Sequence, residues 1–220
     1  MNYNERAENC AVEYVILHYT GMRTGAEALA RLRDPSSEVS AHYLIEEDGK
    51  CFPLVDEKYR AWHAGQSFWR GIRDINSCSI GIELVNPGHE FGYRPFPESQ
   101  IAALEKLLGE IKQRYNLKES AFLGHSDVAP ARKTDPGELF PWQRLAQKGF
   151  GLWPDNPIAS TQSIPELLAQ IGYDISEPKA AETAFLRHYR PQRLDAGFDD
   201  ESRMILACLA RMLYPAPFTV

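Results

Sequence analysis

The sequence of 220 residues is long enough for one mid-sized domain with a solid core, plus a small second module. A net charge of -6, with no cluster of lysines and arginines, argues against a nucleic-acid partner. No stretch approaches the roughly 20 apolar residues of a membrane span. The N-terminal residues lack the basic patch and apolar run of a signal peptide, so we expect a cytoplasmic protein. The alternative is a periplasmic or envelope location, if the native N-terminus was truncated.

The four cysteines are scattered, with no CxxC pair and no dense disulfide framework. They are Cys10, Cys51, Cys78 and Cys208. We therefore expect reduced thiols. A single disulfide between Cys51 and Cys78 is the alternative that the sequence leaves open.

The first strong strand signal covers residues 12–19, which are almost continuously apolar and rich in β-branched side chains. His18 interrupts this run near its end. Thr24, with Glu27 three residues later, has the pattern of a capping box and predicts a helix through Leu32.

A β-hairpin is predicted next, from residues 42–46 and 50–55 on either side of Asp48-Gly49. This dipeptide suits the positive φ angles of a tight hairpin turn. The stretch 61–69 that follows is irregular and contains two tryptophans, which is typical of the wall of a binding site.

Residues 79–84 alternate between apolar side chains and Gly or Glu, which is the period of a strand with two different faces. Glu83 is therefore expected to point away from the isoleucine face. Residues 97–115 carry a regular apolar stripe and predict the clearest helix of the chain. A short strand over 121–123 leads into His125, and the next dozen residues are expected to be irregular because of their prolines and glycines.

Strands that alternate with helices, together with one hairpin, predict an α/β fold with a mixed central sheet flanked by helices. The expected domains are 1–150, a linker over 151–162, and a small C-terminal three-helix domain over 163–220. Its helices are predicted at 163–172, 178–189 and 199–214, from caps and apolar stripes.

The polar residues at strand ends and in the irregular loop form a chemically complete set: His18, Glu83, His125, Lys133 and Asp135. Two histidines and one aspartate are the ligand count of a catalytic zinc site that leaves one position open. Glu83 is placed to act as a general base and Lys133 to stabilise an oxyanion. Taken singly, each residue also has a structural interpretation, as a core histidine, an ion-pair partner or a solvated turn.

Several segments carry a resemblance to a known family, and they occur in the family's order. They are Val15-Ile16-Leu17-His18-Tyr19-Thr20, Val39-Ser40-Ala41-His42-Tyr43-Leu44-Ile45, Ala61-Trp62-His63-Ala64-Gly65, Ser79-Ile80-Gly81-Ile82-Glu83 and the run from Gly124-His125 to Lys133-Thr134-Asp135-Pro136-Gly137. Together they resemble the zinc-dependent N-acetylmuramoyl-L-alanine amidases of the AmpD and AmiD type, which are related to T7-type lysozymes and peptidoglycan recognition proteins. The resemblance covers about residues 12–150.

This resemblance implies one zinc ion per chain on His18, His125 and Asp135, with Glu83 and Lys133 as catalytic partners. The implied substrate is peptidoglycan or a muropeptide, cleaved between N-acetylmuramic acid, or its 1,6-anhydro form, and L-alanine. Cell-wall remodelling or muropeptide recycling would be the purpose. Residues 163–214 also resemble the helical peptidoglycan-binding module of some AmiD-type enzymes. The other interpretation of this part is an appendage that packs on the catalytic domain or makes a dimer contact.

Three further residues are candidates for substrate binding: Trp62, His63 and Arg132. Aromatic faces stack on sugars, and arginine binds carboxylates in a bidentate way. The alternative interpretation of Trp62 is a side chain that anchors the core. The alternative for His63 is a structural residue that supports the metal ligands. Two competing functions remain beside the amidase: a non-catalytic peptidoglycan recognition protein, and a zinc hydrolase that cleaves a peptide or N-acetyl bond. Protein partners are not predicted.

Overall fold

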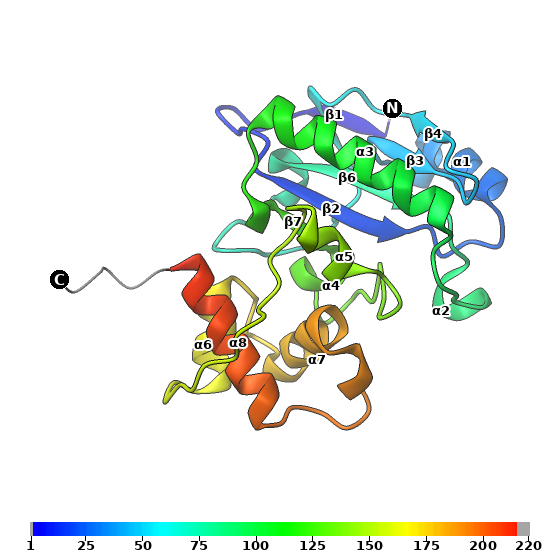
Figure 1. The fold of residues 1–220 in the computed structure, drawn as a ribbon. Helices are drawn as coiled ribbons and strands as arrows, with labels where there is room; N and C mark the ends of the chain where they lie inside the picture. Colours follow the sequence, from blue (N-terminus) through cyan, green and yellow to red (C-terminus); the bar gives the residue numbers. More distant parts are fainter. Residues whose placement is uncertain (1, 215–220) are drawn as a thin grey trace.

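A five-stranded sheet with the strand order β4-β3-β6-β2-β7 lies at the centre of the computed structural model, which describes residues 2–214 (Figure 1). The pairs β3-β6, β6-β2 and β2-β7 are parallel, and the hairpin pair β3-β4 is antiparallel. The strands are β2 (Tyr14–Tyr19), β3 (Tyr43–Ile45), β4 (Cys51–Pro53), β6 (Ser79–Leu84) and β7 (Phe122–Gly124). The predicted mixed sheet is confirmed.

Eight α-helices surround the sheet in the described part of the chain. They are α1 (Gly25–Arg33), α2 (Gly88–Phe91), α3 (Glu98–Tyr115), α4 (His125–Val128), α5 (Trp142–Gln147), α6 (Ile164–Ile171), α7 (Pro178–Tyr189) and α8 (Asp200–Leu213). Short 3-10 helices cover Pro35–Ser37, Ile75–Cys78, Glu119–Ala121 and Pro191–Arg193. Within residues 2–214, none of these helices is long and apolar enough to cross a membrane.

One face of the sheet packs against α3 and α5 and forms an apolar core. The alternation of side chains along a strand sends Val15 and Leu17 of β2 to this face, together with Ile80 and Ile82 of β6. Alternate positions along each strand therefore face either this apolar core or the opposite side of the sheet. Glu83 lies away from the isoleucine face, as its strand period predicted.

The opposite face of the sheet is covered by the segment 62–69 and by the C-terminal helices α6, α7 and α8, which we call the helical region (Figure 1). Tyr14, Ile16 and Leu123 on this face belong to one buried cluster with Phe185 and Leu206 of the helical region. The two parts of the chain therefore share a core.

Capping fixes the ends of the helices in this region. Ser163 and Glu166 form the predicted capping box at the start of α6, in which each residue's side chain accepts a hydrogen bond from the other's backbone N–H. Asp199 accepts from the backbone N–H of Ser202 at the start of α8. Residues 215–220 of the expected C-terminal domain lie outside the described residues, as does Met1 of the N-terminal segment.

Three features differ from the sequence-based expectations. Residues 125–128 form the short helix α4, in a segment expected to be irregular, because the side chain of Asp127 accepts a hydrogen bond from the backbone N–H of Gly124. A second, two-stranded sheet pairs β1 (Tyr3–Glu5) with β5 (Tyr59–Ala61). Trp69 is buried in the shared core and does not line a binding wall. The four cysteines are free, as expected.

Candidate functional site

Three buried side chains converge where the parallel strands end. His18 lies near the carboxyl end of β2, and His125 is the first residue of α4, directly after the neighbouring strand β7. Asp135 returns to the same point from the loop after α4, where its backbone oxygen accepts from the N–H of Ser126 at 2.9 Å. Parallel strands and the turns after them thus bring residues 107 and 117 positions apart into contact.

The three ligand atoms form a nearly equilateral triangle. The Nδ1 atoms of His18 and His125 are 2.9 Å apart. The Oδ2 atom of Asp135 is 2.9 Å from the first and 3.0 Å from the second. Ligand atoms of a tetrahedral zinc ion lie roughly 3.3 Å apart, from bond lengths of about 2.0–2.1 Å, so small outward shifts would seat the ion.

Hydrogen bonds on the far side of each imidazole fix which nitrogen carries the proton. The Nε2–H of His125 donates to the carbonyl oxygen of Ala64 at 3.1 Å. The Nε2 of His18 is 3.1 Å from Nδ1 of His63, whose Nε2 is 3.2 Å from the hydroxyl of Ser79. That hydroxyl donates to the carbonyl oxygen of Ile75 at 2.6 Å, so it accepts from the Nε2–H of His63. The Nδ1 of His63 then accepts from the Nε2–H of His18, which leaves the Nδ1 of His18 without a proton and facing the triangle.

This arrangement leaves three bare acceptors facing one another. Burial, and next the neighbouring His125, lower the pKa of His18 to about 4, so this imidazole is neutral near pH 7. A carboxylate and two unprotonated nitrogens at this spacing repel one another unless a cation binds between them. The donor set therefore fits a metal ion.

Glu83 is the direct neighbour of His18 across the parallel ladder between β6 and β2. Its Oε2 atom is buried and has no hydrogen-bond partner among the described residues. Burial raises the pKa of Glu83 well above its ordinary value, and the charge of Asp135 adds to this, while the ammonium group of Lys133 acts in the opposite direction. A carboxyl group with one buried oxygen that has no described partner is placed to exchange a proton with something bound in the site.

The five predicted site residues line a single cavity of about 600 Å³. Trp62, His63 and Arg132 line the same cavity, so the structure brings all eight candidates together. This volume is in the usual range for a small-molecule site. Tyr19 and Thr134, whose hydroxyl oxygens are 3.0 Å apart, also line it.

The three substrate-binding candidates differ in how they are held. Trp62 is half-buried, and its Nε1–H donates to Oδ1 of Asn4 at 2.6 Å. His63 is only 9% exposed, with contacts at both ring nitrogens. Arg132 is exposed and donates to the carbonyl oxygens of Ala64 and Gln66 through one nitrogen, Nη2.

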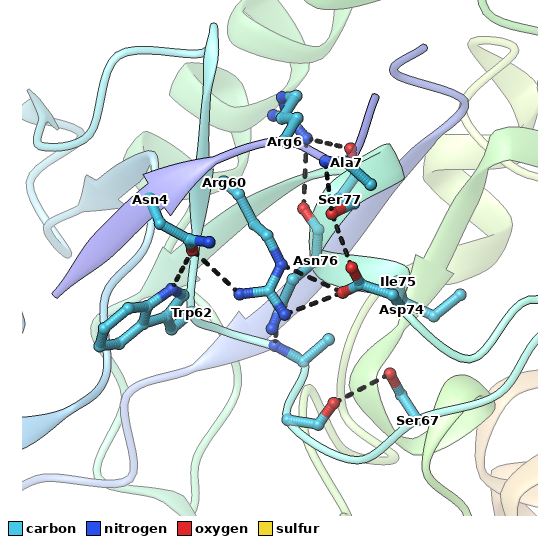
Figure 2. Close-up of polar contacts among 12 residues, drawn as sticks. Asn4, Arg6, Ala7, Arg60, Trp62, Ser67, Asp74, Ile75, Asn76 and Ser77 are labelled. Atoms are coloured by element: carbon cyan, nitrogen blue, oxygen red, sulfur yellow. Dashed lines mark hydrogen bonds and ion pairs between the residues drawn. The ribbon is translucent and has the colours of Figure 1, made fainter. Parts of the chain in front are cut away.

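A polar network behind the cavity wall fastens the segment that carries Trp62 and His63 (Figure 2). The side-chain oxygen of Asn76 accepts from the backbone N–H groups of His63 and Ala64 at 3.1 and 2.8 Å. Asn4 accepts from Trp62 and from Arg60. Sequence reasoning missed Asn76, Asn4 and Ser79, because no local pattern marks an amide or hydroxyl that binds a distant loop.

A family model described as N-acetylmuramoyl-L-alanine amidase matches residues 8–138. AmiD, an N-acetylmuramoyl-L-alanine amidase of Escherichia coli (strain K12), is 38% identical over 230 residues, and the alignment covers 90% of this chain and 82% of AmiD. AmpD of Haemophilus influenzae, a 1,6-anhydro-N-acetylmuramyl-L-alanine amidase, is 39% identical over 107 residues, which cover 48% of this chain and 56% of AmpD.

Two solved structures are similar to this chain over nearly all of its length. The complex of AmiD from E. coli with anhydro-N-acetylmuramic acid-L-Ala-D-γ-Glu-L-Lys has a TM-score of 0.83 and 35% identity, covering 96% of this chain and 93% of that one. AmpDh3 of Pseudomonas aeruginosa, in complex with anhydromuramic pentapeptide, has a TM-score of 0.83 and 32% identity, covering 96% of each chain.

The chain belongs to the N-acetylmuramoyl-L-alanine amidase family. The resemblance and the amidase class predicted from the sequence are confirmed, and the catalytic interpretation is favoured over that of a non-catalytic recognition protein. Similarity to AmiD and AmpDh3 extends through the helical region, whereas the alignment with AmpD covers only about half of this chain.

Proposed function

We propose that this amidase uses zinc to hydrolyse the amide bond between N-acetylmuramic acid, or its 1,6-anhydro form, and the L-alanine of the stem peptide. The observation that carries the proposal is the triangle of His18, His125 and Asp135, which lines a cavity of about 600 Å³. The complexes of AmiD and AmpDh3 with anhydromuramic peptides support the choice of substrate.

His18, His125 and Asp135 would hold the ion, each through one atom. When bound, zinc supplies Lewis-acid chemistry, which polarises a carbonyl group and makes water a stronger nucleophile near neutral pH. We assign to His63 the task of orienting His18, because its Nδ1 is 3.1 Å from the Nε2 of that ligand. This assignment takes precedence over direct sugar binding, since His63 is buried and bonded at both nitrogens.

Glu83 is the general base in this proposal. It takes a proton from the attacking water as the new C–O bond forms, and returns it to the nitrogen of L-alanine as the C–N bond breaks. The products are a free lactyl carboxylate on the sugar and a free amine on the peptide. The raised pKa of Glu83 suits a group that must both take and give a proton.

Lys133 would stabilise the negative charge that develops on the carbonyl oxygen. It lines the cavity, and its charge acts on both His18 and Glu83. Trp62 offers a half-buried aromatic face for the saccharide at the same cavity. The guanidinium of Arg132, held on one side by two carbonyl oxygens, would present its other nitrogens to a stem-peptide carboxylate.

The test is hydrolysis of a purified anhydro-muropeptide by protein that has been stripped with a chelator and then given back zinc. Mass spectrometry should show a free lactyl carboxylate and a peptide with a free alanine amine, only in the zinc-loaded sample. His18→Ala and Asp135→Ala should bind zinc far more weakly. Equal release with and without zinc would refute the metal assignment, and cleavage at a peptide or N-acetyl bond would refute the substrate.

The domain limits of 1–150, 151–162 and 163–220 and the cytoplasmic location stay predictions. In this proposal residues 1–150 carry the chemistry and the helical region adds contacts to the glycan. Binding of the full chain to intact sacculi, compared with hydrolysis of small muropeptides, measures that contribution. Fractionation of native cells tests the location, and recovery from the periplasm or envelope would support the alternative.

A further inference from the structure

A buried carboxylate joins the helical region to the turn that carries the metal-ligand candidate His125. Asp127 is 1% exposed and lies in α4, two residues after His125. Its Oδ1 accepts from the hydroxyl of Tyr173 at 2.8 Å. Its Oδ2 accepts from the backbone N–H of Gly124 at 2.7 Å and lies 2.8 Å from Nδ1 of His188. Two of these three partners belong to the helical region.

The position of Asp127 makes these contacts relevant to the metal site. The N–H that it accepts belongs to Gly124, the residue directly before His125, so the carboxylate fixes the backbone from which that imidazole projects. The next residue, Ser126, donates its N–H to the backbone oxygen of Asp135. Any shift of this turn therefore displaces two of the three ligand candidates together.

A second contact reinforces the first. The ring of His188 stacks on Trp142 with centroids 3.9 Å apart. Trp142 in turn packs closely against Gly124, because a Cβ added to Gly124 would lie 3.2 Å from Trp142. The same Cβ would lie 2.8 Å from Pro136, which follows Asp135. His188 thus holds both the carboxylate and the aromatic ring against the turn that bears His125.

We propose that Tyr173 and His188 are positioning residues for metal binding, which clamp Asp127 and thereby hold His125 and Asp135 in place. The helical region is then part of the catalytic apparatus and not only a place for glycan contacts. This proposal rests on the proposed metal role of His125 and Asp135.

The experiment compares two single-atom deletions in the full-length protein. Tyr173→Phe removes the hydroxyl that donates to Asp127 and leaves its Oδ1 without a described partner. Tyr189→Phe is the matched control: it lies in the same region against His188, and its hydroxyl makes no hydrogen bond to any described residue. His188→Asn, which retains a donor near the Nδ1 position, is compared with His188→Leu, which does not.

The readouts are the zinc dissociation constant, measured by competition with a chromophoric chelator, and the visible spectrum of the cobalt-substituted protein. Direct partners of metal ligands are worth about 10–100-fold in affinity, so a partner one step further away should be worth roughly 3–10-fold. We expect Tyr173→Phe and His188→Leu to weaken zinc binding by this factor and to change the cobalt spectrum. His188→Asn should recover part of the loss, and Tyr189→Phe should match the wild type.

Kinetics with zinc in excess give a second, independent readout. Because the hydroxyl of Tyr173 donates to Asp127 and not to a substrate-binding candidate, Tyr173→Phe should lower kcat more than it changes KM. Wild-type zinc affinity and cobalt spectrum in Tyr173→Phe, or an equal loss in Tyr189→Phe, would overturn the proposal. A wild-type protein that binds zinc but cleaves no muropeptide would instead refute the proposed function, and the metal affinities would still decide the clamp.

Discussion

Gly81→Ala is the substitution that tests most directly how the metal site is supported. Gly81 lies in β6 opposite Ile16 of β2, with its Cα facing the ring of His63. An added Cβ would lie 2.7 Å from Nδ1 and 2.5 Å from Cδ2 of that ring. Both distances are shorter than 3.0 Å, and real Cβ atoms essentially never make contacts that short. The imidazole would have to move by most of an ångström.

That movement would break two hydrogen bonds. His63 is 3.1 Å from Nε2 of His18 and 3.2 Å from the hydroxyl of Ser79, so both contacts would stretch beyond hydrogen-bonding distance. Overpacking of this kind costs about 1–3 kcal/mol. For a chain of this size each kcal/mol lowers Tm by about 2–4 °C. Loss of the orienting partner of His18 should also weaken zinc binding by about 10–100-fold.

The assay is thermal unfolding with and without zinc, together with zinc competition at fixed pH. Gly109→Ala is the matched control, because Gly109 lies within α3 and an added Cβ would meet only Phe150, at 3.8 Å. We expect that control to raise stability by about 0.5–1 kcal/mol from helix propensity. An unchanged Tm and zinc affinity in Gly81→Ala would refute the supporting role of His63.

Three further changes separate chemistry from structure. Glu83→Gln should keep zinc and lose about 10²–10⁴-fold in kcat, measured by stem-peptide release, because the amide cannot take the proton from water. Lys133→Ala should also keep zinc and lose about 10²–10³-fold in kcat, measured in the same way, because it removes a charge that stabilises the developing oxyanion. Phe185→Ala, at a side chain that is 0% exposed, should cost about 3–5 kcal/mol and lower one common calorimetric transition for the whole chain.

Each of these changes has a control of the same chemistry on the surface. Glu110→Gln and Lys106→Ala lie on the exposed side of α3 and should leave kcat unchanged. Met212→Ala, at a side chain that is 43% exposed, should cost far less than Phe185→Ala. Loss of zinc from Glu83→Gln, near-normal turnover in Lys133→Ala, or two separate transitions of which Phe185→Ala moves only one would contradict the respective interpretation.

Most regular elements followed from local patterns. The alternation around Glu83 predicted β6, and the apolar stripe of residues 97–115 predicted α3 to within one residue. The pairing of β1 with β5 did not follow, since each strand has three residues and no distinctive period. The helix α4 was missed because its stability depends on the carboxylate of Asp127 and on contacts from the helical region, which no local pattern displays.

The site was predictable in its members and not in its support. Ordered motifs around His18, His125 and Asp135 selected these residues, although each of them alone also had a structural interpretation. The roles of His63 and Asp127 depend on contacts between residues 45 and 61 positions apart, which only the fold brings about. No local pattern marks His188, which is buried and contacts Asp127 and Trp142.

The shared core has a consequence for biosynthesis. When the ribosome has completed β7 at Gly124, all five strands exist, but the face that bears Tyr14 and Ile16 lacks the cover of the helical region, whose first helix begins at Ile164. A nascent chain at that stage exposes an apolar surface of the kind that chaperones bind. We expect metal loading to await synthesis of α7, because Tyr173 and His188, which hold the turn before His125, are made after all five strands.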